Sequence, residues 1–414
     1  MSNAAVHPAH RRVVGVLVAA QVLSGAGLAA GITVGALLAQ DLLGSTGLSG
    51  LPSALFTIGS AAAAVLVGRL SQRWGRRAGL SLGYGAGALG SLGVVVAAAL
   101  GNVALLFSAL FVYGAGTAAN LQARYAGADL APEQHRGRAV STVLMATTLG
   151  AVAGPNLAEI TGDLADALDI PRLAGPFLLA AAAYAAAALV LWVMLRPDPL
   201  LTARELAASA PQDIGARHRV TGVSGGGGRL VLGASVMVLT QLVMAGIMTM
   251  TPIHMQHHGH DVGAAGLVIA VHVAGMYLPS PISGLLVDRF GRLPVATAAA
   301  VTLLAAGLLA ALAPPHSVLL LALALGLLGL GWNFGLVSGT AIITDTVPLA
   351  TRAKTQGTVD VAIALSGAGG GLASGLVVAG SDYATLTIVG GVVALAIIPA
   401  VAWTARTRSP ESVG

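Results

Sequence analysis

Long apolar stretches and short polar ones alternate along almost the whole chain. A helix needs roughly 20 apolar residues to cross the hydrocarbon core of a bilayer, and only helices or closed barrels pair all their backbone groups there. The stretches are continuous, whereas barrel strands are short and alternating. We therefore expect an all-α membrane protein with twelve transmembrane helices, over residues 13–39, 48–70, 78–100, 103–127, 139–161, 174–195, 230–252, 262–287, 294–313, 317–341, 356–380 and 384–404.

The composition supports this interpretation. Hydrophobic residues make up 56% of the chain and charged residues only 9%, against about 25% charged residues in a typical soluble domain. The 56 glycines would oppose helices in water, but small residues let membrane helices pack closely.

Several sequence features recur 216 residues further along the chain. They are the segment GRLSQRWGRR at 68–77, which returns as GLLVDRFGRL at 284–293, and Asp129, Pro132 and Arg136, which return as Asp345, Pro348 and Arg352. A repeat of this length predicts two copies of one six-helix bundle, an architecture typical of secondary transporters.

The longest polar stretch lies between the two copies, at residues 196–229, and ends in the glycines 225 to 228. This composition is typical of a flexible linker, and a short amphipathic helix around residues 202–208 is an alternative to a disordered tether. The expected domains are an N-terminal bundle at 1–195, the linker, and a C-terminal bundle at 230–414.

The positive charges indicate the orientation. With both termini in the cytoplasm, every Lys and Arg except Arg172 falls on the cytoplasmic side, as the positive-inside rule requires. One Lys against twenty Arg is typical of a GC-rich bacterial genome, so we expect a multi-pass protein of a bacterial inner (plasma) membrane. Basic residues spread over short loops argue against a nucleic-acid partner. We expect a monomer in contact with membrane lipid.

The two loop segments resemble the signature of the major facilitator superfamily, Gly-x-Leu-x-Asp-Arg-x-Gly-Arg. The resemblance covers the whole chain and implies that both loops take part in gating. The implied gating residues are Gly68, Arg73, Gly75 and Arg76 in the first copy and Gly284, Asp288, Arg289, Gly291 and Arg292 in the second.

The residue types in these loops indicate which contacts each one can make. Gly68 and Gly284 permit close helix contact, and Asp288 can accept hydrogen bonds from a neighbouring helix N-terminus or an Arg. Arg289 and Arg292 are expected to hold their loop at the anionic leaflet. Gln72 replaces the acid in the first copy, so we expect that copy to form the weaker latch.

Methionine and histidine gather in the first helix pair of the second copy. Met244 and Met248 are four residues apart on one predicted helix, and His272 and Met276 are four apart on the next, so each pair shares a face. Thioethers are soft ligands that favour Cu(I), and imidazole also binds copper.

The pattern Met-x-x-x-Met followed by His-x-x-x-Met resembles the CcoA-like copper importers, a branch of the same superfamily. The resemblance implies copper uptake, with these four side chains as metal ligands. The branch also includes riboflavin transporters, the chain has no cysteine, and Met at helical spacing often serves packing alone. The alternative is therefore proton-coupled transport of a small organic solute, either riboflavin-like uptake or drug-like efflux.

A second group of histidines follows directly, at the expected outer end. His254, His257, His258 and His260 are candidates for capturing metal at the mouth of the path. A solvated loop that responds to pH explains them equally well.

Other candidates lie inside the predicted spans. A buried acid is costly, so Asp360 is either the carrier of a coupling proton or a structural partner for a nearby Arg or for a helix N-terminus at the cytoplasmic end. Arg124 is expected to snorkel or to pair with Asp129. Trp332 and Asn333 are expected to line the cavity, as is Pro155, which ends a Gly-Pro segment similar to one in drug exporters.

The sequence contains no phosphate-binding loop and no nucleophile–base pair. We therefore expect neither an enzyme nor a cofactor. The expected function is secondary active transport of a metal ion or small solute, by alternating access of the two bundles.

Overall fold

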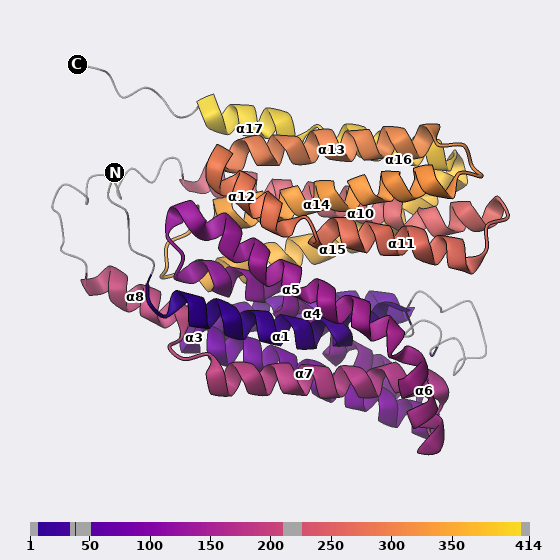
Figure 1. The fold of residues 1–414 in the computed structure, drawn as a ribbon, viewed down its shortest axis with the longest axis horizontal. Coiled ribbons are helices and arrows are strands. Elements are labelled where there is room, and N and C mark those ends of the chain that lie inside the picture. The colour runs from indigo at the N-terminus through magenta and orange to yellow at the C-terminus, as the bar shows by residue number, and fades with distance from the viewer. Residues whose placement is uncertain (1–6, 34–37, 39–50, 210–225, 407–414) are drawn as a thin grey trace. The chain divides into compact units, whose positions relative to one another are not determined.

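The computed structural model describes all residues except 1–6, 34–37, 39–50, 210–225 and 407–414. In that part of the chain every regular element is an α-helix or a short 3-10 helix (Figure 1). Ten of the described helical segments are long and apolar enough to cross a membrane. The predicted all-helical membrane fold is therefore confirmed.

The described part of the first half contains six α-helices of 10 to 50 residues, several of which match predicted spans closely. They are α1 (His10–Thr33), α3 (Leu51–Leu100), α4 (Val103–Asp129), α5 (Arg136–Asn156), α6 (Ala158–Ala167) and α7 (Gly175–Met194), with 3-10 turns η1 (Glu133–His135) and η2 (Arg172–Ala174). The helix α3 combines two predicted spans. It bends at Gly75, whose φ of 90° is a conformation that side-chain-bearing residues rarely adopt.

The second half repeats this order after the short helix α8 (Pro199–Ser209). Its helices are α10 (Gly226–His257), α11 (Val262–Tyr277), α12 (Ser280–Phe290), α13 (Arg292–Leu312), α14 (Val318–Thr346), α15 (Arg352–Gly380), α16 (Tyr383–Ala394) and α17 (Ile397–Arg406). The short helix predicted near residues 202–208 is therefore present. The glycines at 226–228, predicted to end the linker, instead form the first turn of α10.

The chain divides into two compact units that differ from the linear halves by two short exchanges. Unit 1 comprises Met1–Pro132, Thr142–Glu205 and Leu349–Leu365, and unit 2 comprises Glu133–Ser141, Leu206–Pro348 and Ser366–Gly414. The segment at 133–141 and the start of the segment at 349–365 correspond at the 216-residue offset. Each unit therefore includes the first turns of a helix that belongs, by sequence, to the other half.

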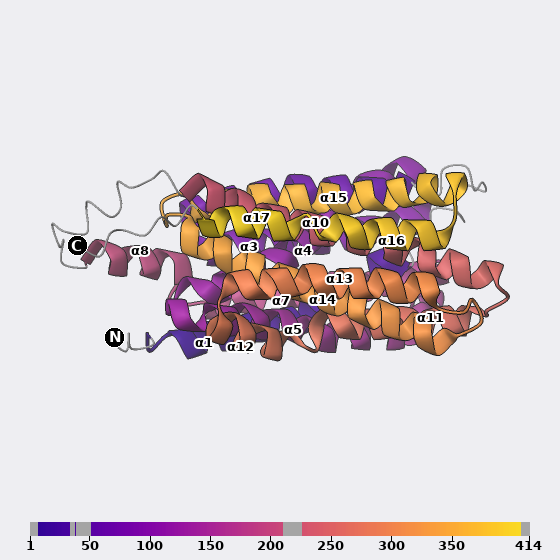
Figure 2. The same ribbon diagram turned by 90° about the horizontal axis from the view of Figure 1, so that it is seen from above.

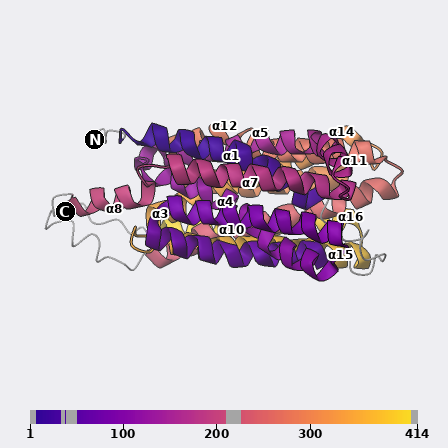
Figure 3. The same cartoon turned by 90° about the horizontal axis from the view of Figure 1, so that it is seen from below.

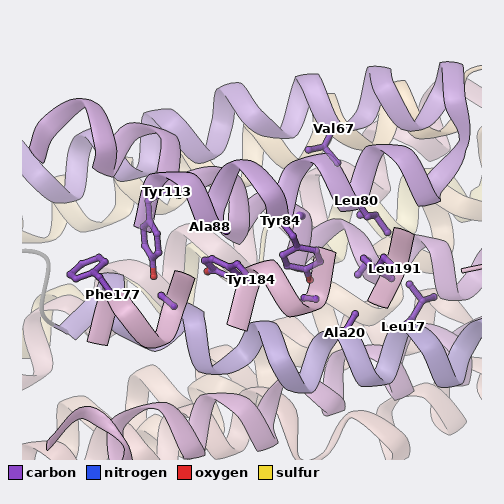
Figure 4. Close-up of a cluster of buried hydrophobic side chains, with 14 of the residues drawn as sticks. Leu17, Ala20, Val67, Leu80, Tyr84, Ala88, Tyr113, Phe177, Tyr184 and Leu191 are labelled. Carbon is purple, nitrogen blue, oxygen red and sulfur yellow. The ribbon is translucent and has the colours of Figure 1, made fainter. Parts of the chain in front are cut away.

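The core of unit 1 combines many Ala, Leu and Val side chains with a few buried aromatic rings, and α7 lies beside α1 there (Figure 3). Tyr113, Phe177 and Tyr184 are fully buried, and the ring centroid of Tyr113 lies 5.5 Å from that of Phe177 and 5.8 Å from that of Tyr184. Figure 4 shows these rings in a row with Tyr84 between α3, α4 and α7. The hydroxyl of Tyr113 donates to the carbonyl of Gly27, so its polar end is satisfied although it is buried.

Small and branched aliphatic residues fill the core of unit 2. One cluster joins α10, α13, α14 and α17 through Leu232, Val236, Ala296, Ala300, Ile342 and Ile397. Figure 2 shows α13 running alongside α16 and α17. At one end of the unit the hydroxyls of Thr251 and Tyr383 lie 2.8 Å apart and tie α10 to α16.

Candidate functional site

The first signature loop, in unit 1, caps the start of α15. The side-chain Oε1 of Gln72 accepts hydrogen bonds from the backbone N–H of Ala353 at 2.8 Å and of Lys354 at 3.3 Å. The first N–H groups of a helix have no partner inside the helix. Gln72 therefore supplies the missing acceptor, and we call this contact the first latch.

The second signature loop, in unit 2, caps the start of α5 in the same way. Asp288 accepts from the N–H of Gly137 at 2.8 Å and of Arg138 at 3.0 Å, and the guanidinium of Arg138 lies 3.7 Å from the same carboxylate. All these residues lie 216 positions from their counterparts in the first latch. This second latch confirms that Asp288 accepts hydrogen bonds from a helix N-terminus, whereas the guanidinium of Arg138 contributes an ion pair only.

Each latch is supported by a matching cluster of charges, which is buried in unit 1 and partly buried in unit 2. In unit 1, Asp129 lies 2.8 Å from Arg76 and 3.8 Å from Arg352. In unit 2, Asp345 lies 2.8 Å from Arg292 and also pairs with Arg136. The clusters obey the 216-residue offset, so the predicted repeat is confirmed in three dimensions.

The clusters also correct one expectation. Arg292 was expected at the lipid surface, but it is only 16% exposed because it is engaged by Asp345. Arg73 and Arg289 are exposed, and each guanidinium lies over the ring of the next residue, Trp74 or Phe290.

Close approach explains the glycines of both latches. A Cβ on Gly68 would lie 2.8 Å from the carbonyl oxygen of Ala353, and one on Gly284 would lie 2.6 Å from that of Gly137. Gly75 and Gly291 turn the chain, with φ values of 90° and 96°. All four glycines are therefore required by the local geometry.

The first latch contains more hydrogen bonds than its neutral side chain suggested. Besides capping α15, the amide of Gln72 donates to the carbonyls of Leu349 at 3.2 Å and Ala350 at 2.7 Å. A carboxylate cannot donate these bonds. The replacement therefore exchanges charge for two further contacts, which the sequence-based expectation of a weaker latch did not include.

A buried ion pair without a counterpart in the repeat lies in unit 1. The Nη2 of Arg124 on α4 is 2.7 Å from the Oδ1 of Asp360 on α15, and the hydroxyl of Tyr125 donates to the same oxygen at 3.2 Å. Arg124 and Asp360 are at most 2% exposed. The predicted pairing of Arg124 with Asp129 is wrong, because Arg76 occupies that carboxylate.

The other carboxylate oxygen of Asp360, Oδ2, is buried and accepts no hydrogen bond among the described residues. Positions 216 away hold Thr340 and Leu144, which cannot form such a pair. A buried charge pair is costly and is retained where it has a specific use. This pair is therefore a candidate for a functional role, and it does not belong to the repeated scaffold.

A polar and aromatic group in unit 2 was only partly predicted. The indole Nε1 of Trp332 on α14 donates to the Oε1 of Gln241 on α10 at 2.7 Å, and the ring of Tyr277 meets the indole edge-on at 5.8 Å. Only Trp332 was a sequence candidate. Gln241 was missed, although an isolated Gln inside an apolar stretch is a signal that could have pointed to it.

The two other cavity candidates have different outcomes. Asn333 is fully buried, and its amide donates to the carbonyl of Met276 and to the hydroxyl of Ser280, both at 2.7 Å. It therefore stabilises the junction between α11 and α12. Pro155 lies in α5, and its side chain is outside the described part of the structure.

The Met and His candidates for copper lie on α10 and α11, both of which pack mainly against α14. His272 is 1% exposed, and its Nδ1 donates to the carbonyl of Leu325 on α14 at 2.9 Å. Met244 is buried, while Met248 and Met276 are half-buried. One imidazole nitrogen is thus used to fix α11 on α14.

The outer histidines make contacts of their own. His254 stacks on Tyr383 with centroids 4.2 Å apart, the Nδ1 of His258 lies 2.8 Å from the carbonyl oxygen of His254, and the Nε2 of His260 lies 2.8 Å from that of Pro315. His254 and His257 line a hollow of about 190 Å³. Within the described ranges no group of three or more His, Cys, Asp or Glu is placed to hold a metal ion. Metal capture by His254, His257, His258 and His260 stays a prediction, as does the alternative of a solvated loop that responds to pH.

Comparison with known proteins agrees with this geometry. The sequence model of the Major Facilitator Superfamily matches residues 16–232 and again 233–414, once for each half. The chain is 57% identical to the uncharacterized MFS-type transporter YdeG of Bacillus subtilis (strain 168), over 95% of the chain and 92% of that protein. It is 32% identical to the riboflavin transporter RfnT of Brucella anthropi, over 94% of the chain and 95% of that protein.

Solved structures share the fold at low sequence identity. The proton:xylose symporter XylE matches with a TM-score of 0.73 at 18% identity, over 96% of this chain and 95% of its own. The human organic anion transporter MFSD10 matches with a TM-score of 0.73 at 16% identity, over 95% of this chain and 100% of its own. With both halves matched by the family model and the repeated latches in place, the chain belongs to the Major Facilitator Superfamily of membrane transporters.

Proposed function

We propose that this protein is a proton-coupled secondary transporter of a small organic solute of the flavin kind. The observation that carries the proposal is the 32% identity to a riboflavin transporter along nearly the whole chain. Flavin recognition requires flat apolar surface and groups that hydrogen-bond to ring heteroatoms.

The chemistry of Trp332, Gln241 and Tyr277, which we call the Trp332 group, supports this class of cargo. Its indole and the ring of Tyr277 offer aromatic faces. The oxygen of the Gln241 amide accepts from Trp332, while its nitrogen has no hydrogen-bond acceptor among the described residues and could donate to a cargo. Neutral amides discriminate heteroaromatic edges without the cost of a buried charge.

Copper uptake remains the competing hypothesis. It needs Met244, Met248, His272 and Met276 to converge on one ion, yet His272 uses its Nδ1 on α14. The buried Nε2 of His272 has no hydrogen-bond partner among the described residues, which leaves one nitrogen for metal. A single imidazole with thioethers is a possible Cu(I) donor set, so the assay below includes copper.

The proposed cycle releases one set of buried contacts at a time. Asp360 takes up the coupling proton, which weakens its attraction to Arg124 and frees the start of α15. The latches then open and the site is exposed to the other side of the membrane. We place the latch end and both termini in the cytoplasm of a bacterial inner membrane, and we propose a monomer surrounded by lipid.

Substitutions in the Trp332 group should change cargo affinity. Trp332→Phe keeps an aromatic ring but removes the N–H that orients Gln241, and Gln241→Leu removes the amide. Losing a buried hydrogen bond costs ~1 kcal/mol or more, so the KM for riboflavin uptake should rise about five- to tenfold in each variant. Trp403→Phe is the matched control, because Trp403 is 74% exposed.

The assay measures uptake of radioactive riboflavin and of radioactive copper in cells that express the protein. Met244→Leu and His272→Gln test the competing hypothesis in the same cells. Riboflavin uptake that falls with Trp332→Phe supports the proposal. Copper uptake by the parent that disappears in Met244→Leu would replace the proposal by the metal hypothesis.

A further inference from the structure

The short helix α8 of the linker is anchored to the first signature loop. Asp198, just before the helix, accepts from the backbone N–H of Arg77 at 2.8 Å and also caps α8 through Leu200 and Leu201 at 3.0 and 3.1 Å. A Cβ on Gly75 would lie 2.3 Å from the same carboxylate. The carboxylate of Asp198 therefore occupies the space that a side chain at position 75 would fill.

Arg204 on α8 extends the attachment to both sides of the first latch. Its Nη2 donates to the carbonyl of Gln72 at 3.0 Å, and its Nε donates to the carbonyl of Leu349 at 3.3 Å. One guanidinium thus joins the capping residue to the segment that precedes α15. Hydrogen bonds from a charged donor are about twice as strong as neutral ones.

In the second latch the equivalent carbonyl also accepts from an arginine, but this arginine belongs to the signature loop and not to the linker. Its carbonyl equivalent to Leu349 is that of Glu133, which accepts from the Nη2 of Arg292 at 2.6 Å. In the first latch the corresponding Arg76 donates instead to the side chain of Gln356 at 2.5 Å. The carbonyl of Leu349 accepts from Arg204 as well as from the amide of Gln72, so the two latches differ in which arginine supplies the cation at this carbonyl.

We propose that α8 is a working part of the first latch, with Arg204 and Asp198 as positioning residues that hold it shut. Gln72 lacks the negative charge that Asp288 brings to the second latch. Arg204 of the linker compensates for this with hydrogen bonds from its guanidinium to the carbonyls of Gln72 and Leu349. The linker thereby controls how often the first latch opens but leaves the second latch unaffected. The inference concerns the latch alone and does not depend on which solute is carried.

The natural absence of cysteine permits a direct test. Ala353→Cys places a thiol under the first latch and Ser141→Cys places one under the second, and both positions are fully buried. The rate of labelling by a membrane-permeant maleimide then reports opening of each latch separately. Arg204→Ala should speed labelling at position 353 about tenfold, which corresponds to ~1.4 kcal/mol, and should leave labelling at position 141 unchanged.

Three further variants complete the experiment. Arg204→Lys retains the charge but not the forked geometry and should give an intermediate rate. Asp198→Asn should act in the same direction as Arg204→Ala. Arg196→Ala, at an exposed linker arginine, is the control and should have no effect. Unchanged labelling at position 353 in Arg204→Ala would overturn the inference, and so would an equal rise at both reporters, which indicates general loosening.

Discussion

Replacing Asp360 by Asn is expected to abolish gradient-driven accumulation of the cargo while leaving exchange measurable. The amide cannot take up a proton, so the cycle loses its coupling step, and the accumulation ratio should fall to about one. The substitution also leaves the buried guanidinium of Arg124 without its counter-charge, which costs ~3–5 kcal/mol in comparable cases. Protein level in the membrane must therefore be measured alongside transport.

A neutral double variant separates coupling from structure. Arg124→Gln with Asp360→Asn removes both charges, so no unpaired buried ion remains. If the pair only holds α4 against α15, the double variant should recover accumulation. We expect it to recover folding and exchange but not accumulation, and Asp360→Glu, which still titrates, to retain part of it. Recovered accumulation in the double variant would contradict the coupling role.

Blocking the close approach at the latches should be the other large effect. Gly284→Val would push side-chain carbons into the backbone of Gly137 and the hydroxyl of Ser141, where even a Cβ would lie 2.6 and 2.1 Å away. Gly68→Val meets Ala353 and Gly357 in the same way. Overpacking costs ~2 kcal/mol, so the latched state should be populated roughly thirtyfold less and transport should be nearly lost.

A control for these variants exists in the helix that carries Gly68. Gly85 on α3 has nothing within 4 Å of an added Cβ, and its counterpart in the repeat is Val301. Gly85→Val should therefore transport normally. Initial rates measured at equal protein level decide the outcome. Near-normal transport by Gly68→Val and Gly284→Val would remove the latches from the cycle.

Features that depend on periodicity and repetition were predictable from the sequence. Apolar stretches of sufficient length gave the helices, and the 216-residue offset gave the equivalence of Gly68 with Gly284. The contact of Asp288 with a helix N-terminus was one of two predicted alternatives, the other being an Arg, because a carboxylate accepts hydrogen bonds from either group. The structure confirms each of these predictions.

Features that depend on a distant partner were not predictable. Arg124 and Asp360 are 236 residues apart and have no counterparts in the repeat, so neither spacing nor symmetry could join them. Arg204 was one basic residue in a polar linker, and only the fold brings it to Leu349. His272 matched a ligand pattern by spacing, but spacing does not say which neighbour the imidazole meets, and it meets Leu325.

The domain boundaries at residues 195 and 230 and the cytoplasmic placement of the termini stay predictions. The linker is described only as far as Ser209 and again from Gly226. Its described part is more ordered than a tether requires, because Asp198 and Arg204 bind the first loop. A linker composition therefore does not exclude a defined structural role.

The most direct test is accumulation of riboflavin by the purified protein in liposomes with an imposed pH gradient. Our account predicts uptake above the equilibrium ratio that collapses when a protonophore is added and is lost in Asp360→Asn. Trp403→Phe should behave as the parent. Absence of riboflavin accumulation under a sustained gradient, with copper accumulating in its place, would contradict the account.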